Sequence, residues 1–235
     1  RRGFDVVIVV SAMGEATDNL LTLATRVADD PMPRELDLLL ASGEQVSSSL
    51  LAMAIQAQGE DATALTAAQS GIVTSDGHGS AEVVDVRTRR IQHELAQGRV
   101  AVVAGFQGLN PADEVATLGR GGSDTSAVAL AAALDADTCQ IFTDVDGVYT
   151  ADPRVVPGAR RIDEIDYEQM LALSRYGAKV LHADAVEHAQ RHSVRIRVRS
   201  TFDAPVDGAG SDGTAVGPAE ETNTPSVSAI AGRRN

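Results

Sequence analysis

The chain has 235 residues, of which 43% are hydrophobic and 23% charged, a composition typical of a folded globular protein rather than a disordered one. Its formal net charge of −13 argues against binding to nucleic-acid backbones, and its single cysteine, Cys139, excludes an internal disulfide framework. No apolar run approaches the roughly 20 residues of a membrane span, and the start of the chain is not a signal peptide. We therefore expect a cytoplasmic protein that binds neither nucleic acid nor membrane.

Short β-branched runs alternate with helical patterns along most of the chain. We expect strands at residues 5–10, 82–86, 99–105, 138–143 and 194–198, the last of these being the final strand. We expect helices at residues 17–28, 35–58 (interrupted at 41–44), from the second strand to about 97, 121–134, 167–173 and 178–191. Residues 70–80 and 106–119 are expected to be mainly loops. This alternation predicts an α/β fold, a three-layer αβα sandwich with a mainly parallel central sheet.

The composition changes after residue 202. Residues 203–235 are rich in Gly, Pro, Ser and Glu, as in a linker. We therefore expect residues 1–202 to form one domain and residues 203–235 to form a linker that follows it.

Three of the expected strands end in loops rich in Gly, Ser and Asp, after Val10, Gly105 and Phe142. In parallel sheets, ligands bind where such loops meet helix starts. In the segment from Gly119 to Asp124, adjacent glycines allow close backbone approach to an anion, and Arg120 offers a bidentate grip on a carboxylate or phosphate. A flexible, capped turn explains the same residues. The segment is neither a Walker A loop nor a dinucleotide fingerprint.

The loop from Thr143 to Arg154 carries three carboxylates and an arginine. It is not an EF-hand, because it lacks the terminal glutamate and the alternating ligand positions. Its carboxylates suit ribose hydroxyls, and Arg154 suits phosphate, so the loop favours a nucleotide site. A solvated acidic turn remains the alternative.

The basic residues comprise 19 arginines and one lysine, Lys179. Retention of one lysine in so biased a chain suggests a need for a compact ammonium group, although chance explains it equally well. His188 and His192 stand at helical spacing, and without cysteine or carboxylate support we expect an exposed helix face rather than a metal site. Cys139 lies inside an expected strand and is expected to be a core residue.

Six segments together resemble the aspartate kinases of the amino-acid kinase family. They occur in the family's order between about residue 5 and residue 202, at residues 10–18, 42–44, 104–108, 119–124, 143–154 and 177–182. The resemblance implies transfer of the γ-phosphoryl group of ATP to the side-chain carboxylate of L-aspartate, forming 4-phospho-L-aspartate. It implies ATP and Mg²⁺ as cofactors, small molecules as substrates, and a homodimer.

The resemblance also implies roles for individual residues. Glu44 would bind the substrate's ammonium group and Arg120 its α-carboxylate. The same pocket would be completed by Thr17, Phe106, Gly121, Gly122 and Ser123. Ser11 would lie near the transferred phosphoryl group, Lys179 would reach the phosphates, and Asp124 would orient cationic groups or help to place Mg²⁺. The nucleotide would be surrounded by Thr143, Asp144, Tyr149, Asp152 and Arg154.

This division of labour agrees with the chemistry of the reaction. A side-chain carboxylate has a pKa of about 4, so it is ionised near pH 7 and needs no general base. The difficulty is to bring one anion to another, and catalysis must therefore depend on positioning and positive charge.

The sequence departs from the family's pattern at both ends. The family's N-terminal strand and Lys-Phe/Tyr-Gly-Gly-Thr-Ser loop do not occur, and residues 225–231 resemble the start of a regulatory ACT domain. We therefore expect both ends to be cut. Two alternatives stay open: a related kinase acting on another carboxylate substrate, such as glutamate, and an inactive nucleotide-binding homologue.

Overall fold

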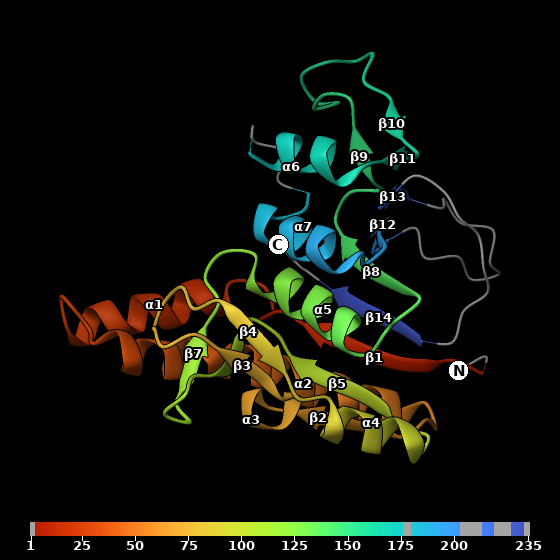
Figure 1. Ribbon diagram of the computed structural model, residues 1–235. Helices are drawn as coiled ribbons and strands as arrows, with labels where there is room; N and C mark the ends of the chain where they lie inside the picture. The colour runs from red at the N-terminus through yellow and green to blue at the C-terminus, as the bar shows by residue number, and fades with distance from the viewer. Residues whose placement is uncertain (1–2, 176–179, 203–212, 219–226, 233–235) are drawn as a thin grey trace.

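The computed structural model describes residues 3–175, 180–202, 213–218 and 227–232. Its centre is an eight-stranded sheet in the order β11-β13-β12-β8-β14-β1-β5-β2 (Figure 1). In that order the strands are Glu164–Ile165, Thr214–Val216, Ile196–Ser200, Thr138–Thr143, Val227–Gly232, Asp5–Val10, Val100–Ala104 and Ala62–Leu65. Only the β12–β13 pair of this sheet is antiparallel within the described residues, which confirms the prediction of a mainly parallel central sheet.

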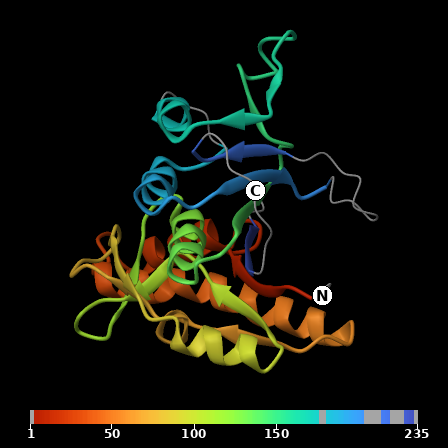
Figure 2. The ribbon, with the colours of Figure 1, turned by 45° about the vertical axis from the view of Figure 1, so that its right-hand side comes forward.

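Seven helices and two small sheets complete the described part of the chain (Figure 2). The helices are α1 (Ala16–Val27), α2 (Pro33–Ala57), α3 (Ala67–Ser70), α4 (Arg89–Ala96), α5 (Gly122–Ala133), α6 (Tyr167–Arg175) and α7 (Ala183–His192). One small sheet has the order β4-β3-β6-β7, with strands Val83–Val86, Ile72–Thr74, Gln107–Leu109 and Val115–Thr117. The other pairs β10 (Arg161–Ile162) with β9 (Val148–Tyr149).

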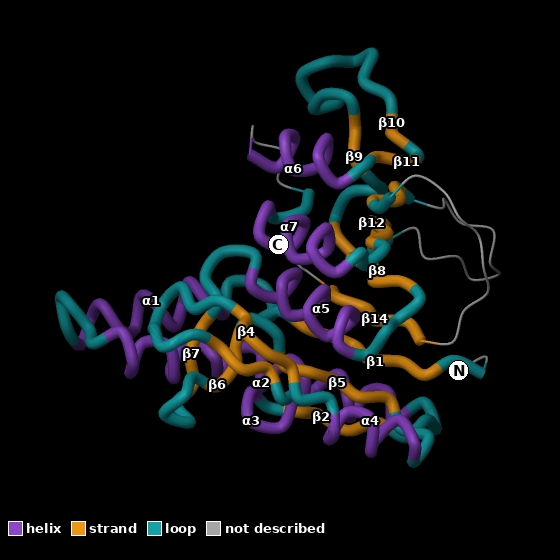
Figure 3. Tube along the Cα trace, in the orientation of Figure 1, coloured by secondary structure: helices purple, strands orange, loops and turns teal. Residues whose placement is uncertain are grey.

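Alternating side chains of β1 divide the hydrophobic core into two layers. Val7 and Val9 are buried in a cluster with residues of α4 and α5. Val10, from the other face of the strand, packs in a second cluster with Ala52 of α2. Helices therefore cover both faces of the sheet, as Figure 3 shows in purple against the orange strands. The predicted three-layer αβα sandwich is confirmed.

The structure corrects the prediction of an interruption at residues 41–44, because α2 is continuous from Pro33 to Ala57. Gly43 lies inside this helix against the end of β1, where an added Cβ would be 2.9 Å from the Cβ of Ala12. The glycine weakens the helix locally by about 1 kcal/mol relative to alanine. Tertiary packing requires the small residue, and this outweighs its low helix propensity.

Other differences concern short strands. Residues 70–80 and 106–119, expected to be loops, contain β3, β6 and β7, each only three residues long. The prediction that residues 194–198 form the last strand is wrong, since β13 and β14 follow β12 and join the central sheet from within the expected linker. The last major helix begins at Ala183 rather than at 178, and residues 176–179 lie outside the described part of the chain.

Helix α2 also corrects the statement that no apolar run has the length of a membrane span. It has 25 residues and an apolar window of mean hydropathy 1.4, so by length and composition alone it passes as a candidate span. However, it buries two carboxylates, Asp37 and Glu44, and packs one face against β1, β2 and β5. These contacts are those of a core helix.

Candidate active site

Most of the predicted site residues lie at one edge of the central sheet. Strands β1, β5 and β8 run in the same direction, so the loops that follow Val10, Ala104 and Thr143 leave the same edge. Helix α5 runs back against β8 and begins at this edge with Gly122. The geometry therefore brings the three glycine- and aspartate-rich loops together, as their positions after parallel strands predict.

Glu44 reaches this edge from α2. Its side chain is only 3% exposed, and its Oε1 accepts a hydrogen bond of 2.9 Å from the backbone N–H of Ala12, the residue after Ser11. Its Oε2 is also buried and has no hydrogen-bond partner among the described residues. Burial raises the pKa of Glu44 to about 7, with the Ala12 hydrogen bond acting in the opposite direction. Among the described residues, this carboxylate has no positively charged hydrogen-bond donor.

Phe106 forms a strained corner after β5. Its φ of +68° is uncommon for a bulky residue, and the conformation is held by hydrogen bonds at both of its backbone groups. Its N–H donates to Ser126 Oγ at 3.1 Å, and its carbonyl accepts from Leu118 N at 2.9 Å. The ring lies over Gly122, where an added Cβ would be 2.8 Å from Phe106 Cδ2. Strain held in this way is typical of functional sites.

The turn before α5 contains two glycines in the left-handed conformation. Gly119 and Gly121 both have a φ of +71°, and an added Cβ at Gly121 would lie 2.3 Å from His182 Cβ. Between these glycines, Arg120 is exposed and makes no hydrogen bond or ion pair with the described residues. Its guanidinium is therefore available to an anionic ligand.

Two further predicted residues lie in the first turn of α5. The carboxylate of Asp124 is 3% exposed. Ser123 is partly buried beside Gly105, where an added Cβ would be 3.0 Å from Ser123 Oγ. Ser123 is therefore close to the end of β5.

The predicted nucleotide residues make three separate local contacts at the end of β8 and after it. Thr143 Oγ1 donates to Asp144 Oδ1 at 3.0 Å, and Tyr149 donates to Asp146 at 3.0 Å, which raises the pKa of the tyrosine hydroxyl. Arg154 binds Asp152 through two side-chain bonds of 3.1 and 3.0 Å, and this holds the pKa of the Asp152 carboxyl below its usual value. The Arg154 side chain is 89% exposed, so the pair lies open to solvent.

Some predicted residues are not joined to this group by any described contact. Thr17 is in the first turn of α1, partly buried, and Lys179 lies outside the described residues. His188 is half-buried and its ring centroid is 4.6 Å from that of His192, so only His192 fits the expected exposed helix face. Burial lowers the pKa of His188 to about 4. In the described part of the chain, no three His, Cys, Asp or Glu side chains cluster in a way that could hold a metal ion.

Cys139 has a simpler role. It is fully buried in β8 within the main cluster, and burial raises the pKa of its thiol. The prediction of a core residue is confirmed.

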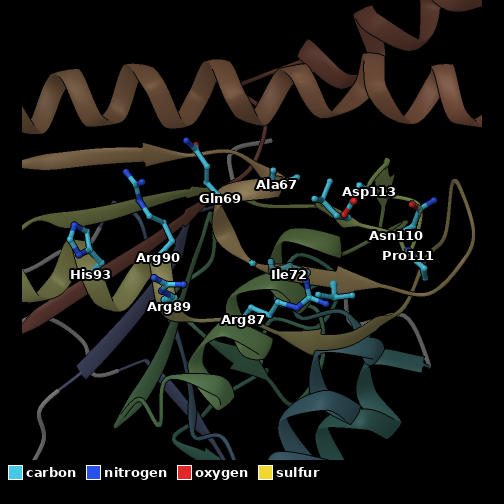
Figure 4. A pocket seen from close by; sticks show the side chains of 14 residues that line it. Ala67, Gln69, Ile72, Arg87, Arg89, Arg90, His93, Asn110, Pro111 and Asp113 are labelled. Atoms are coloured by element: carbon cyan, nitrogen blue, oxygen red, sulfur yellow. The ribbon is translucent and has the colours of Figure 1, made fainter.

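Two cavities lie apart from most of these residues. One, of about 590 Å³, is lined by α3, β3, the start of α4 and the turn between β6 and β7, and includes Arg87, Arg89, Arg90 and His93 (Figure 4). None of the predicted site residues lines it. The other, of about 290 Å³, lies between α1 and α2 and is mostly apolar, with Met13, Leu20, Gly43 and Val46 in its wall.

Sequence reasoning missed a buried network beside the site. Asp37 of α2 is 1% exposed and binds His78, Gly79 and Thr117, which are 41, 42 and 80 residues away in the chain. The available signal was an acidic residue within the apolar stretch of a helix, since such a residue is rarely buried without partners.

With this geometry established, comparison with known proteins identifies the family. Residues 1–200 match the amino acid kinase family, and the chain belongs to it. Within that family the chain is 52% identical over 203 residues to the aspartokinase of Mycolicibacterium smegmatis, covering 86% of this chain and 48% of that protein. It is 52% identical over 201 residues to aspartokinase 2 of Bacillus subtilis, covering 86% of this chain and 49% of that protein.

Solved structures give the same relationship. Aspartate kinase from Synechocystis superposes with a TM-score of 0.78 at 43% identity, covering 94% of this chain and 35% of that one. Aspartokinase III of E. coli, solved in complex with aspartate and ADP, superposes with a TM-score of 0.75 at 34% identity, covering 87% of this chain and 45% of that one. The chain thus spans about half the length of the curated relatives it matches.

Proposed function

We propose that this chain carries the catalytic part of an aspartate kinase, which transfers the γ-phosphoryl group of ATP to the side-chain carboxylate of L-aspartate. A carboxylate oxygen of aspartate forms a bond to the γ-phosphorus, and the bond between that phosphorus and the β,γ-bridging oxygen breaks, leaving ADP. No proton needs to be removed, because the attacking carboxylate is already ionised near neutral pH.

Glu44 is the observation that carries the proposal. Its buried Oε1 is anchored to Ala12 N at 2.9 Å, whereas its buried Oε2 has no hydrogen-bond partner among the described residues. A substrate ammonium group would donate to that free oxygen and supply the missing charge. An ammonium donor beside Glu44 and a carboxylate on the exposed guanidinium of Arg120 together match the two α-substituents of an amino acid.

The remaining predicted residues have complementary roles. Thr17, Phe106, Gly121, Gly122 and Ser123 would shape the substrate pocket. Ser11 follows β1 and would lie near the transferred phosphoryl group. Thr143, Asp144, Tyr149, Asp152 and Arg154 would hold the nucleotide.

The residues at this edge also fit a magnesium ion. Mg²⁺ in such sites is bound through one or two carboxylates together with substrate phosphates, so a cluster of three protein ligands is not required. Asp124 and the exposed Asp144 would supply the carboxylates. When bound with ATP, the ion neutralises charge that develops on the phosphates.

ADP release measured as a function of amino acid tests this proposal. We expect release that requires both L-aspartate and Mg²⁺. Dependence on another amino acid would favour the related-kinase alternative. One methylene changes transition-state binding by about 1–3 kcal/mol, so rates must be compared quantitatively. ATP binding by calorimetry with no turnover on any carboxylate would favour an inactive homologue.

Lys179 has a separate test. It is the chain's only lysine, and we propose that its ammonium group neutralises the phosphates. Lys179→Ala should lower turnover far more than thermal stability, and Lys179→Arg should also be impaired because a planar fork does not replace a point charge. Near-normal turnover of Lys179→Ala would remove Lys179 from the mechanism, whereas near-normal turnover of Lys179→Arg would show that a planar cation replaces the ammonium group.

A homodimer is also part of the proposal. Between Leu36 and Ala57, the only charged residues of α2 are the buried Asp37 and Glu44. Four of the exposed large side chains of this stretch are apolar, namely Leu38, Val46, Leu50 and Met53, and Gln56 near the C-terminal end is the polar one. Sedimentation velocity should show a dimer that Val46→Glu dissociates. Val84→Glu, at an equally exposed apolar position on β4, should leave it intact.

The domain division and the location of the protein remain predictions. We propose that residues 1–202 form most of the catalytic unit, which the family match over residues 1–200 supports, and that β13 and β14 complete its central sheet. The sequence predicts a cytoplasmic location without nucleic-acid or membrane partners.

A further inference from the structure

Asp37 is the most highly connected buried carboxylate of the described residues that lies outside the predicted pocket. Its Oδ1 accepts from Thr117 Oγ1 at 2.6 Å, and its Oδ2 accepts from Thr117 N at 3.1 Å. The N–H of Gly79 lies 3.1 and 3.0 Å from the two oxygens. His78 Nδ1 lies 2.9 Å from Oδ2 and donates to it when the ring proton is on that nitrogen.

These bonds join two segments that are distant in sequence. One is the turn between β3 and β4, which contains His78 and Gly79, and the other is the end of β7 at Thr117. The backbone bond from Ala81 N to Thr117 O, at 2.9 Å, fixes the same two segments side by side. The hydrogen bonds of Asp37 therefore hold the β3–β4 turn and the end of β7 against the first turns of α2.

Both segments lead directly to the turn at residues 119–123, the substrate turn, which contains Arg120. Thr117 is three residues before Arg120, and the β3–β4 turn packs on the intervening Gly119. An added Cβ at Gly119 would lie 3.5 Å from Ser80 Cα and 3.6 Å from Gly79 O. Because Gly119 and Gly121 both adopt a φ of +71° and no side chain caps α5, the turn has little rigidity of its own. Its position must be set by the segments packed against it.

His78 extends the network to the other side. Its Nε2 lies 3.4 Å from Glu114 Oε2, and Glu114 Oε1 accepts from Arg34 Nε at 2.6 Å. Glu114 immediately precedes β7, and Arg34 is in the first turn of α2. The imidazole thus bridges the helix and the strand that ends at Thr117.

We infer that Asp37 and His78 are positioning residues that hold the Gly119–Ser123 turn, and with it Arg120, in the geometry that binds the α-carboxylate of the acceptor. The inference rests on the proposed function, because it assigns Arg120 to the acceptor. Neither residue lies among the loops of the pocket, so both act through the turn.

Steady-state kinetics of Asp37→Asn test the inference. The variant keeps the size of the side chain but places an amide where the carboxylate accepts hydrogen bonds. We expect KM for aspartate to rise about 10- to 100-fold, the scale of loss expected from displaced binding groups, while KM for ATP changes less than about twofold. Equal rises in both KM values, or none, would overturn the inference.

A matched control separates positioning from stability. Glu94 of α4 is likewise 1% exposed and is bound by Arg90, Arg99 and Thr63, but it lies away from the substrate turn. Glu94→Gln should lower the melting temperature without raising KM for aspartate selectively. If it reproduces the kinetic split of Asp37→Asn, the split reflects general destabilisation and the inference fails.

Variants at His78 keep the test available if Asp37→Asn does not fold. His78→Ala removes the bridge and should raise KM for aspartate. In His78→Asn, KM for aspartate should return most of the way to the wild-type value, because the amide nitrogen of asparagine occupies the position of Nδ1 and can still donate to Asp37. An asparagine variant no better than alanine would contradict the role of that hydrogen bond.

Hydrogen exchange gives a readout that does not depend on activity. We expect faster exchange at the amides of residues 118–122 in Asp37→Asn and His78→Ala, and unchanged exchange there in Glu94→Gln. Unchanged exchange in the first two variants would overturn the inference. If exchange behaves as expected but the wild type shows no aspartate-dependent turnover, the proposed function fails while the positioning of the turn stands.

Discussion

Replacement of Glu44 by glutamine offers a direct test of the site, because it should affect stability and binding in opposite directions. The pKa of Glu44 is raised by burial to about 7, from an ordinary value of 4.5. At a pH well above 7 the folded protein must therefore hold a charge that burial disfavours, at a cost on the order of 3 kcal/mol relative to the unfolded chain.

The pH range of this effect follows from the sign of the shift. Because the folded-state pKa lies above the unfolded value, the contribution of Glu44 to stability is fully present below pH 4.5 and is lost as the pH rises through about 7. Glu44→Gln keeps an acceptor for Ala12 N and carries no charge. The variant should therefore be more stable than the wild type at pH 8 and close to it at pH 4.5.

Substrate binding should respond in the opposite way. An ammonium group bound at Oε2 makes a charge-assisted hydrogen bond, worth about 1.5–3 kcal/mol. Loss of the charge should therefore raise KM for aspartate by about 10- to 150-fold. Binding of aspartate below pH 7 should also release protons, since the ammonium favours the ionised carboxylate.

Urea unfolding at pH 4.5 and pH 8, with titration calorimetry in two buffers of different ionisation enthalpy, measures both effects. Glu94→Gln is the control of opposite sign. Burial raises the pKa of Glu94, but hydrogen bonds from Arg99 and Thr63 outweigh this and leave the pKa below its usual value. That variant should be destabilised at pH 8. A Glu44→Gln variant that loses stability at pH 8, or that binds aspartate normally, would refute the reasoning.

Three further predictions follow from close contacts. Gly121→Ala should destabilise the fold by about 2 kcal/mol or more, because alanine is strained at positive φ and its Cβ meets Cβ and Cγ of His182; the loss in urea unfolding should be smaller in a His182→Gly background, which lacks both atoms, and an equal loss there would contradict the contact. Gly43→Ala should cost about 1–3 kcal/mol and weaken aspartate binding, since the new Cβ displaces α2 from Ala12; unchanged binding would show that α2 does not position Glu44. Cys139 should react with a thiol reagent only in denaturant, because the thiol is buried and its pKa is raised; rapid labelling of the native protein would contradict its burial.

Four strands of the central sheet, β1, β5, β8 and β12, were predictable from the sequence, whereas β2, β11 and β13 were missed. The observed bounds of β1 and β8 are those expected from the sequence, because β-branched and apolar runs in parallel strands are buried on both faces. In the four-stranded sheet, β4 was expected, but β3, β6 and β7 were missed, since three residues are too few to establish an alternating pattern. The continuity of α2 through Gly43 depends on its contact with Ala12, which the local sequence does not contain.

The site was predictable where its residues occur in contiguous loops. Gly119–Asp124 and Thr143–Arg154 form recognisable segments, and their places after parallel strands predict that they meet. The network of Asp37 with His78 and Thr117 was not predictable in this way. These partners lie 41 and 80 residues from Asp37 in the chain, and no sequence pattern connects them with it. Only the folded arrangement brings them together.

Helix α2 has two surfaces that cannot move independently. One side carries Glu44, whose Oε1 is bonded to the end of β1, and the other carries the exposed stretch around Val46 and Met53. Because the helix is continuous through Gly43, it transmits displacement as a rigid rod. A partner that displaces the exposed face of α2 therefore also displaces Glu44. Substitutions on the exposed face are thus constrained by the position that Glu44 must keep.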